Sequence, residues 1–215
     1  MLTLYTYFRS SAAYRVRIAL NLKGLKYNVV PVHLLRDGGQ HHAPDYIRRN
    51  PAELLPTLDD DSLSITQSLA ILDYLEESYP YPPLLPSTAL DRARVRALCL
   101  TIACEIHPLN NLRVLNYLKV QLGTSEDARN EWYRHWVNVG FRAFERLLTC
   151  DASAGMFCHG NTPTFADCCL IPQIFNAKRL QCPLDAFPTL MRICVNCEKM
   201  DAFARADPGS QPDAE

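Results

Sequence analysis

The spacing of hydrophobic and polar residues changes once along the chain, near residue 78. Before that point, short runs typical of strands alternate with helical patterns. The expected strands cover residues 2–7, 27–32, 56–58 and 63–65, and the expected helices cover 11–23, 45–49 and a segment from Ser68. The order βαβ followed by ββα, with a mixed sheet, is typical of a thioredoxin-like domain.

Several of these elements carry local start or stop signals. Gly24 follows the first helical pattern and favours a stop there, because glycine readily adopts the left-handed conformation. Ser68 comes directly before the apolar positions of the next helix and is expected to cap it. Residues 59–61 predict a turn between the third and fourth strands. The polar tail after Asp207 is expected to be loose.

A proline-rich segment separates the two halves of the chain. Residues 78–86 contain four prolines, which neither a helix interior nor a central strand accommodates. After this linker, helical spacing covers residues 87–121, 126–149, 164–181 and 188–204. Thr164 followed by Asp167 predicts a capping box at one helix start. We therefore expect a first domain at 1–82 and an all-α second domain at 83–215.

Composition narrows the class of protein. The formal net charge is −1 and 48% of the residues are hydrophobic, so neither nucleic acid nor an anionic membrane is an expected partner. The chain has no leader pattern and no window of ~18 apolar residues, which predicts a cytoplasmic protein. All nine cysteines lie between Cys99 and Cys197. Their odd number favours reduced, buried thiols over disulfides or metal ligands.

The first strand and the first helix meet at a pair of serines. A helix N-terminus presents unpaired N–H groups and a positive dipole end, so it favours a bound anion. In thioredoxin-like folds this junction carries a redox Cys-x-x-Cys pair, but here residues 10–13 are Ser-Ser-Ala-Ala. A hydroxyl cannot form a disulfide, although it can donate a hydrogen bond to a thiolate. The junction therefore predicts a site for an external thiol.

Two further motifs point to a peptide-like ligand. Pro56 enters the third strand, where a trans bond in a plain turn is the expectation, since cis forms only ~5–6% of X–Pro bonds. A cis bond would instead turn the backbone of Leu55 outward, where it could pair with a ligand in strand fashion. Gln67 and Ser68 offer an amide, a hydroxyl and helix N-terminal N–H groups, which suit an α-carboxylate. Taken singly, Ser68 is a plain helix cap.

Together these motifs resemble the glutathione transferases, and specifically the zeta class, the family of maleylacetoacetate isomerase. The resemblance covers nearly the whole chain and is most specific at residues 9–11 and 14–20. Further matching segments are 37–40, 50–51, 55–58, 67–71, 172–173 and 176–179. Ala12 stands where the class usually has cysteine, and Tyr14 where it has tryptophan. If that cysteine helped to activate glutathione, this chain would be impaired or would rely on the serines alone; we expect the serines to suffice.

The resemblance implies glutathione transferase architecture, with a thioredoxin-like α/β N-terminal domain, an all-α C-terminal domain, and assembly as a homodimer. Glutathione would be the cofactor and would lie across the first domain. Gln67 and Ser68 would hold its γ-glutamyl end, Leu55 beside Pro56 would pair with its cysteinyl backbone, and Gln40 would lie near its glycyl end.

The resemblance also implies an activity, namely the cis–trans isomerisation of maleylacetoacetate in aromatic amino-acid breakdown. Ser10, with Ser11 beside it, would donate to the sulfur of glutathione. The thiolate would add to the conjugated cis double bond, the bond would rotate in the enolate, and elimination would release the trans isomer. Arg9 would bind a carboxylate of the substrate and stabilise the enolate.

The second domain would supply further contacts to this small dicarboxylic oxo acid. By resemblance, Arg179, His107 and Asn110 would face the substrate. Each has a simpler alternative, since Arg179 could belong to a solvated basic patch and His107 could be a structural histidine. Arg9 could likewise pair with a loop acid. Arg15 and Arg17 are two residues apart and cannot share a helix face, so at least one is expected to be structural, in an interdomain ion pair for example.

Three other functions remain open from the sequence. Maleylpyruvate, which is shorter on the keto side, could be the substrate in place of maleylacetoacetate. The same thiolate could serve a general transferase or a dehalogenase of α-halo acids. The alternative that is not an enzyme is a non-catalytic interaction module. The presence of Ser10, Gln67 and Ser68 together argues against it, because such a module has no use for a thiol site.

Overall fold

The computed structural model describes residues 1–61 and 63–215, which form two compact units. The first comprises Met1–Leu84 together with Glu198–Glu215, and the second comprises Leu85–Cys197. The sequence assigned all of 83–215 to the helical domain, so the last eighteen residues differ from that expectation. No helix among the described residues has an apolar stretch long enough to span a bilayer.

The first unit contains a four-stranded sheet of order β2-β1-β3-β4. Strand β1 pairs in parallel with β2 and antiparallel with β3, which in turn pairs antiparallel with β4. The strands are β1 (Thr3–Thr6), β2 (Asn28–Pro31), β3 (Thr57–Asp60) and β4 (Leu63–Thr66). This mixed sheet with its βαβ and ββα halves is the expected thioredoxin-like fold.

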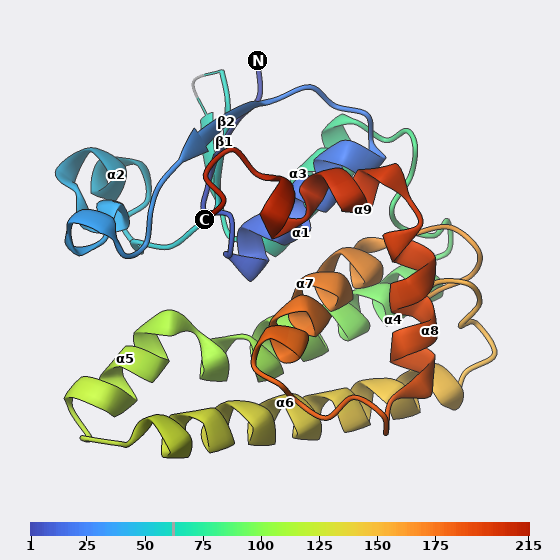
Figure 1. Ribbon diagram of the computed structural model, residues 1–215. Coiled ribbons are helices and arrows are strands. Elements are labelled where there is room, and N and C mark those ends of the chain that lie inside the picture. The colour runs from blue at the N-terminus through green and yellow to red at the C-terminus, as the bar shows by residue number, and fades with distance from the viewer. Residues whose placement is uncertain (62) are drawn as a thin grey trace. The chain divides into compact units, whose positions relative to one another are not determined.

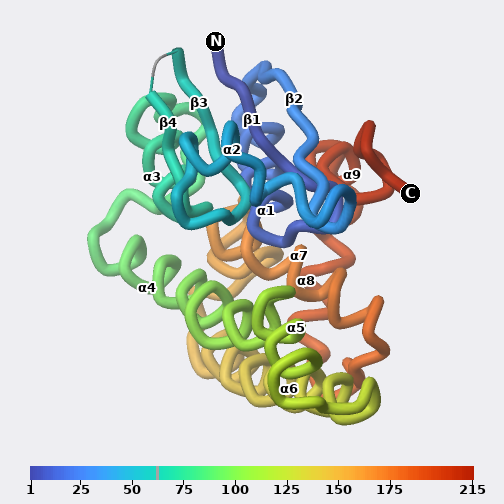
Figure 2. Tube along the Cα trace, turned by 90° about the vertical axis from the view of Figure 1, so that its left-hand side faces the viewer, coloured from blue at the N-terminus to red at the C-terminus, as the bar shows by residue number. Residues whose placement is uncertain are grey.

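Helices cover both faces of this sheet (Figures 1 and 2). Helices α1 (Ser11–Leu22) and α3 (Ser68–Ser78) pack together on one face, and α2 (Pro44–Arg49) lies on the other. Gly24 has φ +65° just after α1, which is the expected glycine stop. The turn expected at residues 59–61 is shorter than predicted, because Asp59 and Asp60 belong to β3. Ser62 lies outside the described residues.

The C-terminal segment is packed, in contrast to the loose tail that its polarity predicts. Helix α9 (Asp201–Ala206) packs against α1, and Asn21 Nδ2 donates to the carbonyl of Ala202 over 3.0 Å. The backbone N–H of Phe8 donates to Asp213 Oδ2 over 3.0 Å. The side chain of Asn21 and the backbone of Phe8 thus hold this segment, and no local sequence pattern reveals partners so far away in the chain.

The proline-rich linker is fixed by a buried ion pair. Lys23 Nζ lies 2.8 Å from Glu76 Oε2 and also donates to the carbonyls of Tyr79 and Pro82 over 2.8 and 3.0 Å. Glu76 in turn accepts from the N–H of Leu84 over 3.0 Å. Both charges are hydrogen-bonded on all sides, which offsets the cost of burying them.

The second unit consists of helices. They are α4 (Ala89–Leu100), α5 (Leu112–Val120), α6 (Glu126–Thr149), α7 (Phe165–Arg179) and α8 (Pro188–Glu198). The single helical segment expected at 87–121 is interrupted, because a π-helical turn (Thr101–Ile106) and a 3₁₀ turn (Pro108–Asn110) separate α4 from α5. Pro108 has no N–H to continue the helix. A Cβ at Gly140 would lie 2.2 Å from Ile106, so α6 approaches this turn closely only because Gly140 lacks a side chain.

Seven of the nine cysteines, all of which the structure describes, are buried in this unit, and none of the nine forms a disulfide. Burial raises the pKa of Cys99 and of Cys158 well above the usual thiol value. These thiols therefore stay protonated and behave as small hydrophobic side chains. No group of three potential metal ligands occurs among the described residues.

The capping box expected at α7 is present and fully buried. Asp167 accepts from the N–H and the hydroxyl of Thr164 over 2.8 and 3.0 Å, and from the N–H of Cys158 over 2.9 Å. Burial raises the pKa of Asp167, while these donors oppose the shift. The carboxylate thus ties the start of α7 to the loop before it.

Replacing Asp167 by alanine should lower the free energy of unfolding by about 3 kcal/mol, because three buried donors lose a charged acceptor. Urea denaturation followed by circular dichroism measures this loss. Asp91→Ala is the matched control, since Asp91 accepts from Thr88 at the half-exposed start of α4 and should cost only about 1 kcal/mol or less. Equal losses for the two variants would contradict a special role of the buried box.

Candidate functional site

Ser10 lies at the junction of β1 and α1 and is the N-cap of α1. Its φ and ψ are −68° and 112°, and its Oγ accepts a hydrogen bond from the N–H of Ala13 over 3.2 Å. The side chain is half-buried. Because the bond to Ala13 uses only a lone pair of Oγ, the hydroxyl proton of Ser10 is left to donate to a ligand.

The neighbours of Ser10 differ in exposure. Ser11 is the first residue of α1 and is only 6% exposed, and Ala12 is half-buried. Arg9 is exposed, with its guanidinium 4.8 Å from the ring centre of Phe8. The structure shows no ion pair of Arg9 with an acid of residues 1–61 or 63–215, although its charge contributes weakly to lowering the pKa of Glu215.

The loop before β3 presents the backbone of Leu55. The Leu55–Pro56 bond is cis, so the expectation of a trans bond is wrong. Tyr46 Oη and Asn50 Nδ2 hold the loop by donating to the carbonyl of Leu54 over 2.6 and 2.7 Å. Neither the N–H nor the carbonyl of Leu55 has a hydrogen-bond partner among the described residues. Both groups can therefore pair with the backbone of a ligand.

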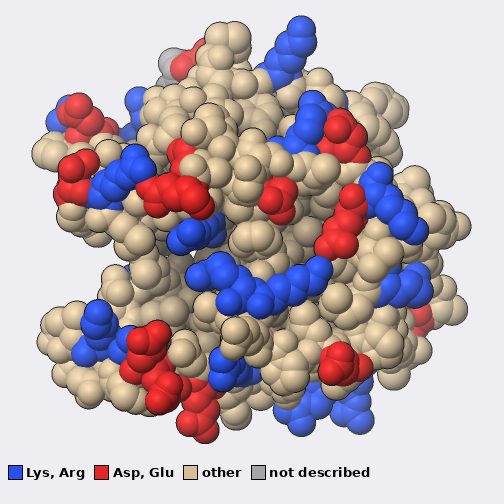
Figure 3. Space-filling model, viewed as in Figure 1, with Lys and Arg blue, Asp and Glu red and all other residues tan. Residues whose placement is uncertain are grey.

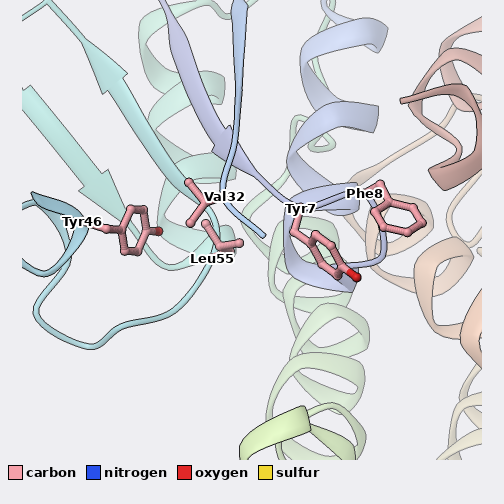
Figure 4. Packing of buried hydrophobic residues seen from close by; sticks show 5 residues of the cluster. All are labelled: Tyr7, Phe8, Val32, Tyr46 and Leu55. Carbon is pink, nitrogen blue, oxygen red and sulfur yellow. The ribbon is translucent and has the colours of Figure 1, made fainter. Parts of the chain in front are cut away.

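Buried apolar residues hold this loop beside the Ser10 junction. Leu55 belongs to the same cluster as Tyr7 and Phe8, and Figure 4 shows these side chains together with the two other members, Val32 and Tyr46. The ring of Tyr7 also contacts that of His33, with centres 4.8 Å apart. Packing thus places the loop after β1, the loop after β2 and the loop before β3 at one end of the sheet.

Gln40 stabilises the loop after β2. Its Oε1 accepts from the N–H of His33 over 2.8 Å, and its Nε2 donates to Asp37 Oδ2 over 3.1 Å. Gly38 and Gly39 have φ values of 76° and 101°, so the loop depends on residues that tolerate the left-handed region. The second N–H of the Gln40 amide is not needed for these bonds and can reach a ligand.

The start of α3 combines a strained backbone with a buried hydroxyl. Gln67 has φ 68° and ψ 114°, a conformation that costs a non-glycine residue about 1–3 kcal/mol and is concentrated at functional sites. The N-cap of α3 is Gln67, so the expectation that Ser68 caps this helix is wrong. Ser68 is 6% exposed, and its Oγ accepts from Arg15 Nη1 over 3.1 Å.

Arg15 and Arg17 are both buried inside the first unit, in contrast to the suggested interdomain ion pair. Arg17 donates to the carbonyls of Phe8 and Ala206, each over 3.0 Å. Sequence analysis did not identify Arg15 as a functional residue. Its position on α1 could have indicated that the side chain is buried, because the residues one turn away on the same helix face are small or apolar.

In the second unit, the side chain of Asn110 contacts Tyr133 of α6. Its Nδ2 donates to the carbonyl of Tyr133 over 3.3 Å, and its buried Oδ1 has no hydrogen-bond partner among the described residues. Burial raises the pKa of Tyr133 to about 12, and the positive charge of Arg179 opposes this shift. Arg179 is exposed and its Nε donates to Asn176 Oδ1 over 3.3 Å. His107 is half-buried, with its Nε2 3.4 Å from Asn111.

Tyr133 and Gln173 are the residues that sequence analysis missed in this unit. Tyr133 is 4% exposed and Gln173 is 2% exposed, and Nε2 of Gln173 has no hydrogen-bond partner in the described structure. For Gln173 the available signal was a polar residue directly between apolar residues of α7, whereas the polar sequence around Tyr133 gives no such signal. Figure 3 shows acidic and basic side chains interspersed over one face, in keeping with the near-zero net charge.

The chemistry of the first unit fits glutathione. The ligand needs a donor for its sulfur, strand-like pairing for its backbone and donors for two carboxylates. The hydroxyl of Ser10 could provide the first and the backbone of Leu55 the second. The N-terminus of α3 with Ser68 and the amide of Gln40 are candidate donors for the carboxylates.

Comparisons with known proteins identify the family. Residues 1–77 match the family model described as the glutathione S-transferase N-terminal domain. The maleylacetoacetate isomerase of Rhizobium meliloti is 49% identical over 205 residues, which is 95% of each chain. The chain belongs to the zeta class of glutathione transferases, the family of the maleylacetoacetate isomerases.

Two solved structures match over almost the entire chain. One is a holo structure of a maleylpyruvate isomerase, a bacterial glutathione transferase of the zeta class, with 44% identity and a TM-score of 0.96 over 99% of this chain and 100% of that one. The other is the maleylacetoacetate isomerase of Methylobacterium extorquens with bound malonate and glutathione. It is 41% identical, with a TM-score of 0.95 over 99% of both chains.

Proposed function

We propose that this protein is a glutathione-dependent cis–trans isomerase that converts maleylacetoacetate to fumarylacetoacetate. The observation that carries the proposal is the hydroxyl of Ser10, which lies at the start of α1 with its proton free for a thiolate. The similarity to maleylacetoacetate isomerases over 95% of the chain, and to one structure with bound glutathione, supports it.

Glutathione is the cofactor, and when bound it supplies the thiolate that adds to the cis double bond and is eliminated after rotation about that bond. The chain's own residues hold and activate this group. Ser10 and the positive end of α1 stabilise the negative sulfur, which favours the ionised thiol at neutral pH. Leu55 pairs with the backbone of the ligand, Ser68 binds its γ-glutamyl carboxylate, and Gln40 binds near its glycyl end.

The residues proposed for the substrate are cationic or polar. Arg9 is exposed next to Ser10 and can bind a carboxylate with its guanidinium, which also stabilises an enolate formed beside it. From the second unit we propose Arg179, Asn110 and His107. Bound malonate in the Methylobacterium extorquens protein supports a dicarboxylate as the ligand class.

Maleylpyruvate is the second candidate substrate, because a zeta-class maleylpyruvate isomerase is as similar in sequence and fold. We further propose that the protein works in the cytoplasm, since buried cysteines without disulfides suit a reducing compartment. Membership of the zeta class supports the proposal that it assembles as a homodimer.

Absorbance assays with maleylacetoacetate and with maleylpyruvate, each with and without glutathione, test the activity. Turnover that requires glutathione is the expected result, and the ratio of kcat/KM for the two substrates identifies the preferred one. Absence of turnover on both, with glutathione still bound, would contradict the proposal and point to the dehalogenase or transferase alternative.

Replacing Arg9 by methionine should raise KM for the dicarboxylate about tenfold or more, because one charged hydrogen-bonding partner of a carboxylate is lost. KM for an uncharged electrophile such as chlorodinitrobenzene should change little. Arg48→Met, which removes an exposed arginine paired with Asp45, is the control and should leave both values unchanged. An equal rise for both substrates would show that Arg9 supports glutathione or the fold.

A further inference from the structure

Arg15 is a buried cation whose hydrogen bonds are incomplete. The residue is 2% exposed on α1, and its Nη1 donates to Ser68 Oγ over 3.1 Å. Its Nε and Nη2 are buried and have no hydrogen-bond partner among the described residues. No carboxylate of the described chain forms an ion pair with it.

Such an arrangement is costly unless an anion completes it. A guanidinium stays charged at all physiological pH values, so it cannot relieve its burial by losing a proton. A buried charge without a partner lowers the stability of a fold. The chain therefore carries a cationic group whose missing partner is negative and comes from outside the described residues.

The position of Arg15 indicates which anion this is. Ser68 is the first residue of α3, an eleven-residue helix whose N-terminus follows the strained Gln67. Since Ser68 Oγ accepts from Arg15, the hydroxyl proton of Ser68 is directed to another acceptor. The dipole of α3, the hydroxyl of Ser68 and the charge of Arg15 thus favour a carboxylate at the same place.

We propose that Arg15 is a positioning residue for the α-carboxylate at the γ-glutamyl end of glutathione. It holds the Ser68 hydroxyl in the donating orientation and neutralises the carboxylate with its charge. The inference rests on the proposed function only in that glutathione is the ligand, and it requires no isomerisation.

Titration calorimetry on the full chain without substrate tests this role. The two ligands are glutathione and γ-aminobutyryl-cysteinyl-glycine, which lacks only the α-carboxylate. In Arg15→Met, the Kd for glutathione should rise about 10- to 100-fold, as expected when a charged hydrogen-bond donor is lost. The Kd for the analogue should stay within about threefold of the wild-type value, because the carboxylate that Arg15 serves is absent.

Thermal unfolding of the ligand-free protein separates this role from a structural one. Because Arg15 is an uncompensated charge, Arg15→Met should keep or raise the Tm without ligand while it weakens glutathione binding. The proposal would be overturned if Arg15→Met left the Kd for glutathione unchanged. It would also be overturned if the variant lost equal affinity for glutathione and for the analogue, with or without a large fall in Tm.

A second variant decides the matter if Arg15→Met does not fold. Arg15→Lys keeps the charge but not the planar donor geometry, so the preference for glutathione over the analogue should fall without disappearing. An unchanged preference would overturn the proposal. Wild-type protein that binds glutathione but isomerises neither substrate would refute the proposed function alone, and wild-type protein that does not bind glutathione would refute both.

Discussion

Ser10→Ala is expected to reduce kcat by about 10²- to 10³-fold, which is the usual cost of removing a donor that stabilises a developing or resident negative charge. The hydroxyl of Ser10 can donate its proton at the start of α1, because its oxygen already accepts a hydrogen bond from the N–H of Ala13. Without it, the thiol of bound glutathione should ionise at higher pH. The deficit should therefore be smaller at pH 9 than at pH 6.5, which pH–rate profiles of the two proteins measure.

The same substitution also removes a helix cap, which costs about 1 kcal/mol. Ser125→Ala is the matched control, because Ser125 Oγ caps α6 through the N–H of Ala128 over 3.1 Å. Both variants should lose similar stability, and only Ser10→Ala should lose turnover. Unchanged turnover in Ser10→Ala would transfer the proposed role to Ser11.

Arg17→Met is expected to lower the free energy of unfolding by at least about 3 kcal/mol, because it leaves several buried acceptors without donors. Arg17 is fully buried and donates to the carbonyls of Phe8 and Ala206 and to Thr6 Oγ1, each over 3.0 Å. Burial lowers its pKa to about 10, so the side chain remains charged at neutral pH. One guanidinium thus ties β1, the loop before Ser10 and the end of α9 together.

Urea denaturation measures the loss, and hydrogen exchange shows where it occurs. Exchange should rise first in residues 201–215, since the bond to Ala206 holds that segment to α1. Arg205→Met is the control, because Arg205 is largely exposed and pairs with Asp201 one turn away on the same helix; it should cost about 0.5 kcal/mol or less. A loss as small as this in Arg17→Met would show that its acceptors find other donors.

The elements of the fold follow from local signals in the sequence. Alternation of apolar residues defines the strands, and helical spacing together with Gly24 and the Thr164–Asp167 box defines the helix limits. These signals act within a few residues of each other, so they are readable without knowing the tertiary contacts. The serine pair after the first strand predicts a thiol site for the same reason, because a strand–helix junction has fixed local chemistry.

Contacts between distant segments were decided by the tertiary structure alone. The partner of Ser68 and the packed tail at Asp213 both depend on residues far away in the chain. Arg15 and Arg17 lie two residues apart in the same helix. Arg17 donates to carbonyls, whereas Arg15 donates to Ser68 and has two nitrogens with no partner among the described residues. Hydrogen-bond partners of a buried group are chosen by the fold that surrounds it, and local spacing carries no information about them.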